Sequence, residues 1–276
     1  MKAGIDIEPL SAALGAEIRG LDLCAALDDD AFDRIRAAWL THLVLLFRGQ
    51  HLTDPALVAF TARFGELEEA PLFRGRRFVE DHPEVMIVSN VAVDGREIGS
   101  LGNAEAFWHT DLNFVEEPPA ASCLFALEVP PAGGDTGFAN MYRAFEALPD
   151  DLRARIAGRS IRHDARFNSA GYLREVRVPD TVHPIVRTHP ETGRKSLYLG
   201  RRAHASIEGM EAGESEALLD TLWEYATSNA VTWRHQWRAG DLVIWDNRCT
   251  LHRRDPFDAA QRRIMHRTQT RGTRPF

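Results

Sequence analysis

The sequence predicts a mainly β fold, a sandwich or a barrel, with helices packed on the outside. Two observations support this prediction. Short strand-like runs recur along the chain, whereas helical patterns are few, and the two do not alternate regularly as they do in βαβ folds. The length of 276 residues, 44% of them hydrophobic, suffices for a large core. No repeat or obvious linker interrupts the chain, so we expect one domain over residues 1–276.

The N-terminal part predicts two helices and two strands. Residues 28–43 place acidic side chains before apolar ones at helical spacing, and residues 53–66 combine a capping Thr53 with an early proline, so both predict helices. The apolar runs 43–49 and 85–91 predict strands. The Gly- and Asn-rich residues 92–106 predict a loop, and loops that precede a site often cover it.

The remaining elements alternate between strands and helices. Strand patterns cover residues 107–114, 120–130, 241–247 and 262–270, and residues 181–200 predict a hairpin around a Pro-Glu-Thr-Gly turn. Gly133, Gly134 and Asp135 form a turn after the second of these strands. Helical spacing covers residues 142–158, as one helix or as two broken near Pro149, and residues 213–228.

Charge and cysteine content narrow the class of protein. The formal net charge of −7 argues against a nucleic-acid partner, which requires a basic surface. Three widely spaced cysteines without a CxxC pair predict buried, reduced thiols. Neither a signal-peptide pattern nor an apolar run of about 20 residues is found, so we expect a cytoplasmic protein without a membrane partner.

The stretch FWHTDLNF, residues 107–114, places His109 and Asp111 two residues apart, on one face of the predicted strand. A histidine and a carboxylate make up two-thirds of the facial triad that binds non-haem Fe(II), and His252, just after an apolar strand, can supply the third ligand. An H-x-D pair also occurs by chance, and the alternative is a structural histidine.

The strand over residues 262–270 places Arg263 and Arg267 on one face, together with Met265. Arginines on an interior face are costly unless they meet anions, and a planar guanidinium binds a carboxylate through two hydrogen bonds. The alternative is an exposed strand face with solvated charges.

Five separated motifs resemble one family closely: WHTDLNF, VPPAGGDTGFANMYRAFEALP, HPIVRTHPETGRKSLYL, GDLVIWDNRCTLH and QRRIMHRT. They are similar to the TauD/TfdA family of Fe(II)/2-oxoglutarate-dependent dioxygenases, which includes taurine and 2,4-dichlorophenoxyacetate dioxygenases. The resemblance covers nearly the whole chain in the family's order. It implies a double-stranded β-helix (jelly-roll) core and a single TauD/TfdA-type domain.

The resemblance also implies roles for individual residues. His109, Asp111 and His252 match the catalytic Fe(II) ligands, which leave positions for 2-oxoglutarate and O2. Arg263 and Thr136 match the residues that bind the distal carboxylate of 2-oxoglutarate, and Arg267 matches a second arginine near its C1 end or near an anionic substrate group. Because family members are often dimers or tetramers, we expect a homo-oligomer.

The expected reaction is hydroxylation of a small anionic organic substrate, such as a sulfonate, an aryloxyalkanoate or another carboxylate, with release of succinate and CO2. The histidine and tyrosine that hold taurine in the family's taurine enzymes are missing from APLFRGRRF, residues 70–78, which argues against taurine. Phe73, Arg74, Phe114 and Arg267 are candidate substrate-binding residues. Arg201 and Arg202 are expected to be solvated in a loop.

Two other functions use the same three residues. One is a metal-dependent hydrolase, since Zn²⁺ accepts such ligands, and the other is a jelly-roll binding protein without turnover. Neither function requires Arg263 and Thr136 at the family's positions.

Overall fold

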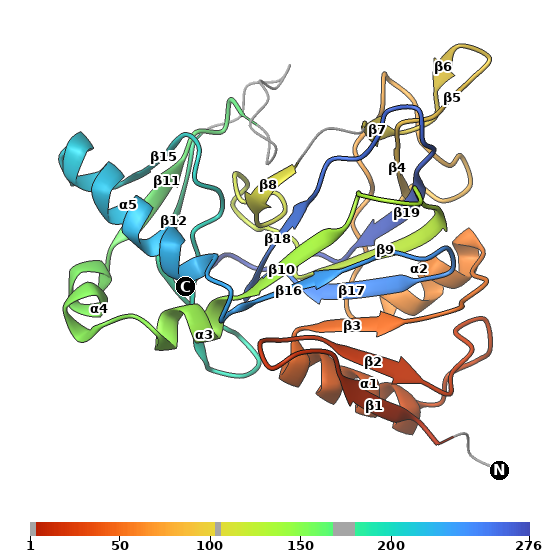
Figure 1. Cartoon of the computed structure of the whole chain (residues 1–276), viewed down its shortest axis with the longest axis horizontal. Coiled ribbons are helices and arrows are strands. Elements are labelled where there is room, and N and C mark those ends of the chain that lie inside the picture. Colours follow the sequence, from red (N-terminus) through yellow and green to blue (C-terminus); the bar gives the residue numbers. More distant parts are fainter. Residues whose placement is uncertain (1–3, 103–105, 168–179) are drawn as a thin grey trace.

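A computed structural model describes residues 4–102, 106–167 and 180–276, and two β-sheets form the centre of the molecule (Figure 1). The fold is mainly β with a jelly-roll core and helices outside, as the sequence predicted. Among the described residues, no helix combines the length and the apolar character needed to span a membrane.

The larger sheet has the strand order β1-β2-β3-β17-β9-β19-β4-β7. In this order the strands are Asp6–Pro9, Ala16–Arg19, Val44–Phe47, Leu242–Asp246, Ala121–Glu128, Ile264–Gln269, Met86–Ser89 and Ser100–Leu101. Strands β9 and β17 lie at its centre and pair antiparallel, with Ile244 opposite Cys123.

The smaller sheet has the order β16-β10-β18-β8, with bounds Thr232–His235, Thr136–Asn140, Thr250–Arg254 and Ala106–His109. Further strands form small sheets: β12 (Thr181–Pro184), β11 (Ser160–His163) and β15 (Ala205–Ile207); β13 (Val186–Thr188) and β14 (Lys195–Leu197); β5 (Ala92–Val93) and β6 (Arg96–Glu97).

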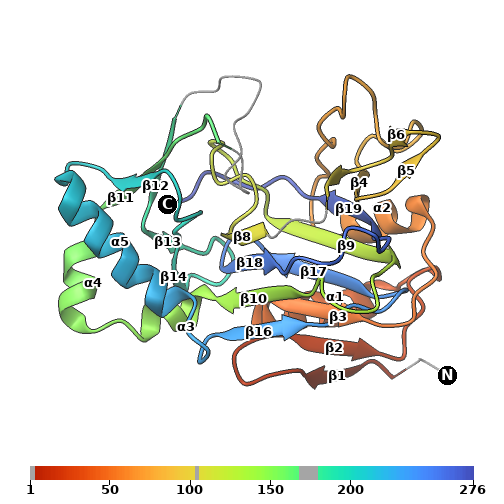
Figure 2. The ribbon, with the colours of Figure 1, turned by 45° about the horizontal axis from the view of Figure 1, so that its top comes forward.

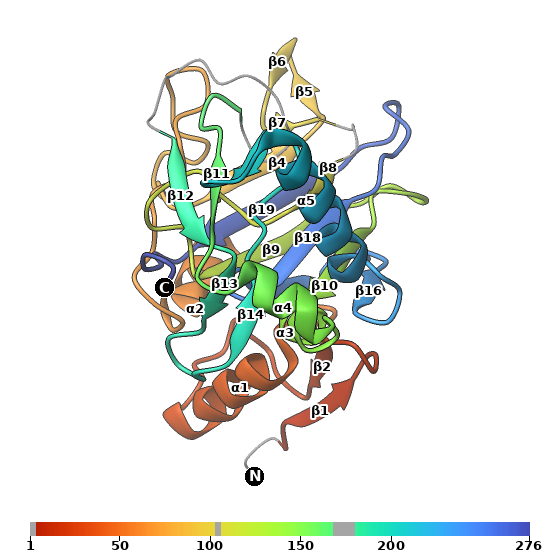
Figure 3. The same cartoon turned by 90° about the vertical axis from the view of Figure 1, so that its left-hand side faces the viewer.

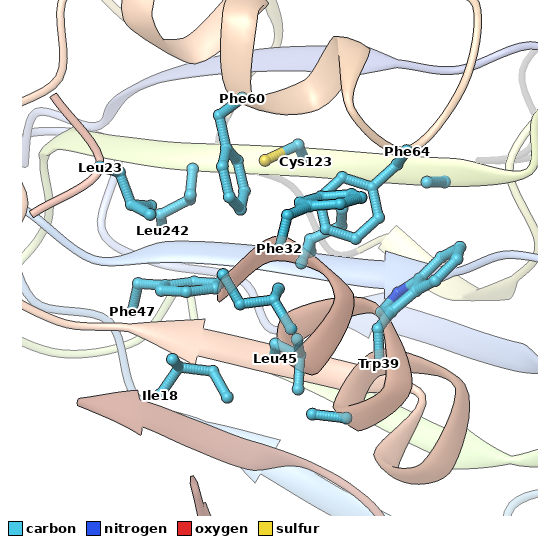
Figure 4. Packing of buried hydrophobic residues seen from close by; sticks show 14 of the residues in the cluster. Ile18, Leu23, Phe32, Trp39, Leu45, Phe47, Phe60, Phe64, Cys123 and Leu242 are labelled. Atoms are coloured by element: carbon cyan, nitrogen blue, oxygen red, sulfur yellow. The ribbon is translucent and has the colours of Figure 1, made fainter. Parts of the chain in front are cut away.

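Helices α1 (Asp29–His42) and α2 (Asp54–Ala62) cover the outer face of the larger sheet. Each begins at a side-chain cap, because Asp28 accepts from the Ala31 amide and Thr53 from the Ala56 amide. Phe32 and Phe60 of these helices pack in one buried cluster with the sheet residues Phe47, Cys123 and Leu242 (Figure 4).

The inner face of the larger sheet packs against the smaller sheet. Val243 and Trp245 point inward to Phe138 of β10, whereas Leu242 and Ile244 point outward to the helices. Both faces of β17 are therefore buried, which explains its continuous apolar sequence.

A third cluster lies at one end of the molecule, where α5 (Ala212–Ala226) packs with α3 (Met141–Glu146) and α4 (Asp150–Ile156) (Figures 2 and 3). The two short helices confirm the break near Pro149.

Several local predictions are wrong. The strand predicted over residues 107–114 ends at His109, and the chain then turns, with Leu112 in a left-handed conformation at φ 46°. The predicted hairpin over residues 181–200 is confirmed for β13 and β14, which pair on either side of the Pro-Glu-Thr-Gly turn, but its first part, β12, pairs with β11 instead. Cys24 is exposed, although Cys123 and Cys249 are buried.

The loop predicted over residues 92–106 contains the two-residue strands β5, β6 and β7. Asp94 and Gly95, both at positive φ, form the turn between β5 and β6. The last part of this loop, residues 103–105, lies outside the described residues.

Candidate active site

His109 and His252 face each other across two paired strands of the smaller sheet. The pairing of β8 with β18 makes them Cα partners, and their ring centroids lie 4.2 Å apart. Asp111 joins them from the turn after β8, with Oδ1 3.8 Å from Nε2 of each histidine. The structure therefore brings the three predicted residues together, and the turn at Leu112, rather than strand alternation, places Asp111.

The protonation states of these side chains suit metal binding. Burial lowers the pKa of His109 and lowers that of His252 to about 3, so both imidazoles are neutral at pH 7. Burial disfavours the charged form of Asp111. The positive charge of Arg267 and several smaller effects together outweigh burial and lower the pKa of Asp111 to about 2. Two neutral nitrogens and one carboxylate are a donor set for Fe(II).

The orientation of His109 is fixed by the main chain. Its Nδ1 lies 2.7 Å from the carbonyl oxygen of Phe107. Since a carbonyl only accepts, Nδ1 carries the proton, and Nε2 keeps the lone pair that faces Asp111.

Arg263 is a buried cation, with 2% of its surface exposed. Among the described residues, its Nε has no hydrogen-bond partner and its guanidinium has no carboxylate within 4.0 Å. Burial, and then the charge of Arg254, lower its pKa to about 9. A buried guanidinium without an anion is costly, and the carboxylate of a ligand would relieve that cost.

Thr136 begins β10, two residues after Gly134. Gly134 lies close to Arg263, since a Cβ added to this glycine would be 3.5 Å from the arginine Nε. The Thr136 hydroxyl oxygen accepts a hydrogen bond of 2.9 Å from Trp237 Nε1. Because that contact uses a lone pair, the hydroxyl proton can be donated to another acceptor.

Arg267 lies next to Asp111, one of the three candidate metal ligands. Its Nη1 donates to Oδ1 of Asp111 at 3.2 Å, and its Nη2 contacts Sδ of Met86 at 3.1 Å. The strand predicted from residue 262 begins only at Ile264 and carries a bulge between Ile264 and Met265. Regular alternation therefore does not relate Arg263 to Arg267.

Of the candidate substrate residues, Phe114 is buried close to the metal-site turn, and its carbonyl accepts from Thr181 Oγ1 at 2.6 Å. Phe73 stacks on Phe78 with ring centroids 5.1 Å apart, and Arg74 pairs with Glu97. Within the described residues, no hydrogen bond, ion pair or ring contact joins Phe73 or Arg74 to the metal-site residues.

A narrow pocket lies beside Arg267. Its lining includes Glu68, Glu69, Glu84, Ala70 and Met86, together with Gln269. Burial raises the pKa of Glu68, against the charges of Arg271 and Arg267.

The two arginines expected to be solvated are placed differently. Arg201 is buried, with 2% of its surface exposed, and its main chain bridges to His109. Arg202 pairs with Glu216 and Asp220 of α5. The expectation of solvated side chains is therefore wrong for Arg201, because the turn after β14 carries it to β8.

Sequence reasoning missed the residues that contact the second oxygen of Asp111. Ser122 Oγ donates to Oδ2 at 2.8 Å, and Gln269 Nε2 donates to it at 3.2 Å. Asn247 Nδ2 in turn donates to Ser122 Oγ at 2.8 Å. The sequence contained a signal for these residues. Each is a polar residue in or next to an apolar strand, and a buried polar group needs a hydrogen-bond partner.

Comparisons with known proteins agree with this geometry. Residues 6–269 match the model of a family described as "Taurine catabolism dioxygenase TauD, TfdA family". An (S)-phenoxypropionate/alpha-ketoglutarate-dioxygenase of Sphingobium herbicidovorans is 36% identical, over 99% of this chain and 96% of that protein. An alpha-ketoglutarate-dependent 2,4-dichlorophenoxyacetate dioxygenase of Cupriavidus pinatubonensis is 38% identical, over 95% and 96%.

A solved structure also resembles the chain throughout. The crystal structure of AAD-2 in complex with Mn(II) and N-oxalylglycine matches with a TM-score of 0.81 at 33% identity, over 99% of each chain.

Proposed function

The chain belongs to the TauD/TfdA family, and from that premise we propose that His109, Asp111 and His252 bind Fe(II) while Arg263 and Thr136 hold 2-oxoglutarate. The protein is an Fe(II)/2-oxoglutarate-dependent dioxygenase, an oxidoreductase that also uses O2. The observation that carries the residue assignment is the convergence of three donor groups within 4.8 Å of one another. The same core holds the buried guanidinium of Arg263, whose Nε has no hydrogen-bond partner among the described residues.

The bound iron supplies the oxidising chemistry, in which 2-oxoglutarate and O2 yield succinate, CO2 and a hydroxylated substrate. The protein's own residues bind and orient the reactants. His109 and His252 would present neutral nitrogens, and Asp111 a carboxylate oxygen, to the bound ion. Arg263 and the Thr136 hydroxyl then fix the far carboxylate of 2-oxoglutarate.

We further propose that the substrate is a small organic anion, an aryloxyalkanoate or a related carboxylate or sulfonate. Two relatives named for phenoxypropionate and 2,4-dichlorophenoxyacetate support this class. Within the structure, Arg267 supports it as a cation beside the carboxylate of Asp111. Phe73, Arg74 and Phe114 remain predicted substrate contacts, and a homo-oligomer in the cytoplasm remains a prediction from the sequence.

A succinate-release screen tests this function. Protein loaded with Fe(II) without O2 is mixed with 2-oxoglutarate, one candidate acid and air, and succinate is measured. We expect an aryloxyalkanoate to increase succinate release well above the rate without substrate, with equal formation of a hydroxylated product. Succinate release that no acid in the screen increases would contradict the proposed substrate class. A hydrolase would release no succinate at all.

A further inference from the structure

We propose that Ser122 and Gln269 are positioning residues that bind the outer oxygen of Asp111 and so restrict this carboxylate to one metal-facing oxygen, Oδ1. The proposal rests on the metal site described above. It assigns a function to polar residues on two central strands, β9 and β19, which the metal-site motif does not include.

The two oxygens of Asp111 have different surroundings. Oδ1 faces Nε2 of His109 and of His252, both at 3.8 Å, and accepts from Arg267 Nη1 at 3.2 Å. Oδ2 points away from them and accepts from Ser122 Oγ at 2.8 Å and from Gln269 Nε2 at 3.2 Å. All three side chains are buried. Only Oδ1 is therefore placed to bind a metal ion between the histidines.

The direction of the hydrogen bond from Ser122 follows from its neighbours. Gln269 Nε2 and Asn247 Nδ2 each lie 2.8 Å from Ser122 Oγ. A hydroxyl has two lone pairs and one proton, and these two amides occupy both lone pairs. The proton of Ser122 is left for Asp111 Oδ2.

The amide orientations are fixed by contacts other than those with Ser122. Trp245 Nε1, which can only donate, lies 2.9 Å from Asn247 Oδ1, so Asn247 must turn its NH2 group toward Ser122. The ionised Asp111 can only accept, so Gln269 must turn its NH2 group toward it. The hydrogen-bond chain from Trp245 through Asn247 and Ser122 to Asp111 thus has one consistent direction.

This arrangement matters for the number of open metal positions. A carboxylate that rotates to bind through both oxygens takes one more coordination position, which a site for two further reactants cannot spare. Rotation of Asp111 would break two buried hydrogen bonds to Oδ2 and leave Ser122 and Gln269 unsatisfied. Loss of such buried hydrogen bonds is costly. Mutation of the residues that hydrogen-bond to metal ligands typically lowers metal affinity or activity by roughly 10–100-fold.

Two variants test the proposal. Ser122→Ala removes one donor to Oδ2, and Gln269→Met removes the other while keeping a side chain of similar length. Ser196→Ala is the matched control, because Ser196 is equally buried on β14 but contacts the Arg248 carbonyl rather than Asp111. Circular dichroism identifies the variants that fold. If Ser122→Ala does not fold, Gln269→Met alone tests the proposal.

The readouts are Co²⁺ affinity by calorimetry and the visible spectrum of bound Co²⁺, which changes when a second carboxylate oxygen replaces a bound water. We expect roughly 10-fold weaker binding or more in both variants, with a changed visible band per bound ion, and no change in the control. Unchanged affinity and spectrum in a folded variant would overturn the positioning role. If instead wild-type protein binds no Co²⁺, or binds it equally well as His252→Ala, the proposed metal site itself fails.

Discussion

His109 and His252 are Cα partners across β8 and β18, although 143 positions separate them in the chain, and their rings lie 4.2 Å apart. Strand pairing in the smaller sheet therefore brings together the two histidines of the proposed metal site. A hydrogen-bonded ladder fixes both main chains, so little entropy is lost when the two side chains bind one ion.

Removal of one proposed ligand should abolish stabilisation by metal. Ions that bind only the folded protein raise its unfolding temperature, and we expect Mn²⁺ to do so for the wild type but not for His252→Ala. His51→Ala, at an exposed histidine, should respond like the wild type. Differential scanning fluorimetry with and without Mn²⁺ makes the measurement. A shift of equal size in His252→Ala would remove that residue from the ligand set.

Arg263→Gln should weaken binding of 2-oxoglutarate specifically. Loss of a charge-assisted contact to a carboxylate costs about 2–3 kcal/mol, which corresponds to a rise in KM of roughly 30–150-fold. The neighbouring variant Arg262→Gln is the control, because Arg262 is exposed and pairs with Glu128. Succinate formation at varied 2-oxoglutarate gives both KM values. Equal values for the two variants would show that Arg263 does not bind the cosubstrate.

Glu68→Gln should improve binding of an anionic substrate. The Glu68 carboxylate lies beside Arg267 and interacts electrostatically with Arg267 and Asp111, so its negative charge opposes an anion bound near them. Loss of one such charge changes binding by about 1 kcal/mol, which would lower KM for the substrate about fivefold. Glu66→Gln, which lies outside the narrow pocket and pairs with Arg271, should change KM little. An increase in KM for Glu68→Gln would instead indicate a cationic group on the substrate.

The stability of the protein should fall as pH decreases below about 6.5. Burial lowers the pKa of His163 to about 3 and of His183 to about 4, so between these values and 6.5 the unfolded chain binds protons that the folded chain does not. Each histidine then contributes a loss of about 1.4 kcal/mol per pH unit. Urea unfolding of metal-free protein at pH 7.5 and 5.5 measures the loss.

A histidine variant separates this contribution from the rest. His163→Gln should show a smaller loss between the two pH values than the wild type, whereas His51→Gln at the surface should show the same loss as the wild type. An identical pH dependence in His163→Gln would mean that His163 does not titrate on unfolding.

The sequence contained much of the fold and the main candidate residues, for reasons that are local. Helices α1 and α2 could be predicted because their capping residues, Asp28 and Thr53, directly precede them. Strand β17 could be predicted from its uninterrupted apolar run. His109 and Asp111 are close in sequence, and the resemblance of five motifs added His252, Arg263 and Thr136.

What could not be predicted depends on pairing between distant segments. Ser122, Asn247 and Gln269 meet only because β17 and β19 flank β9 in the larger sheet. The burial of Arg201 similarly requires its segment to bridge β8. The turn at Leu112 breaks the alternating pattern because of its own left-handed backbone, which the pattern of apolar and polar residues does not encode.

The most direct test of the central claim is an anaerobic titration of the protein with Fe(II) and 2-oxoglutarate, followed by visible absorption. Binding of both at one site gives a charge-transfer band. We expect the band to saturate at one Fe(II) per wild-type chain, to be absent in His252→Ala, and to require much more 2-oxoglutarate in Arg263→Gln. A band of wild-type strength in His252→Ala, or no band in the wild type, would contradict the proposed site.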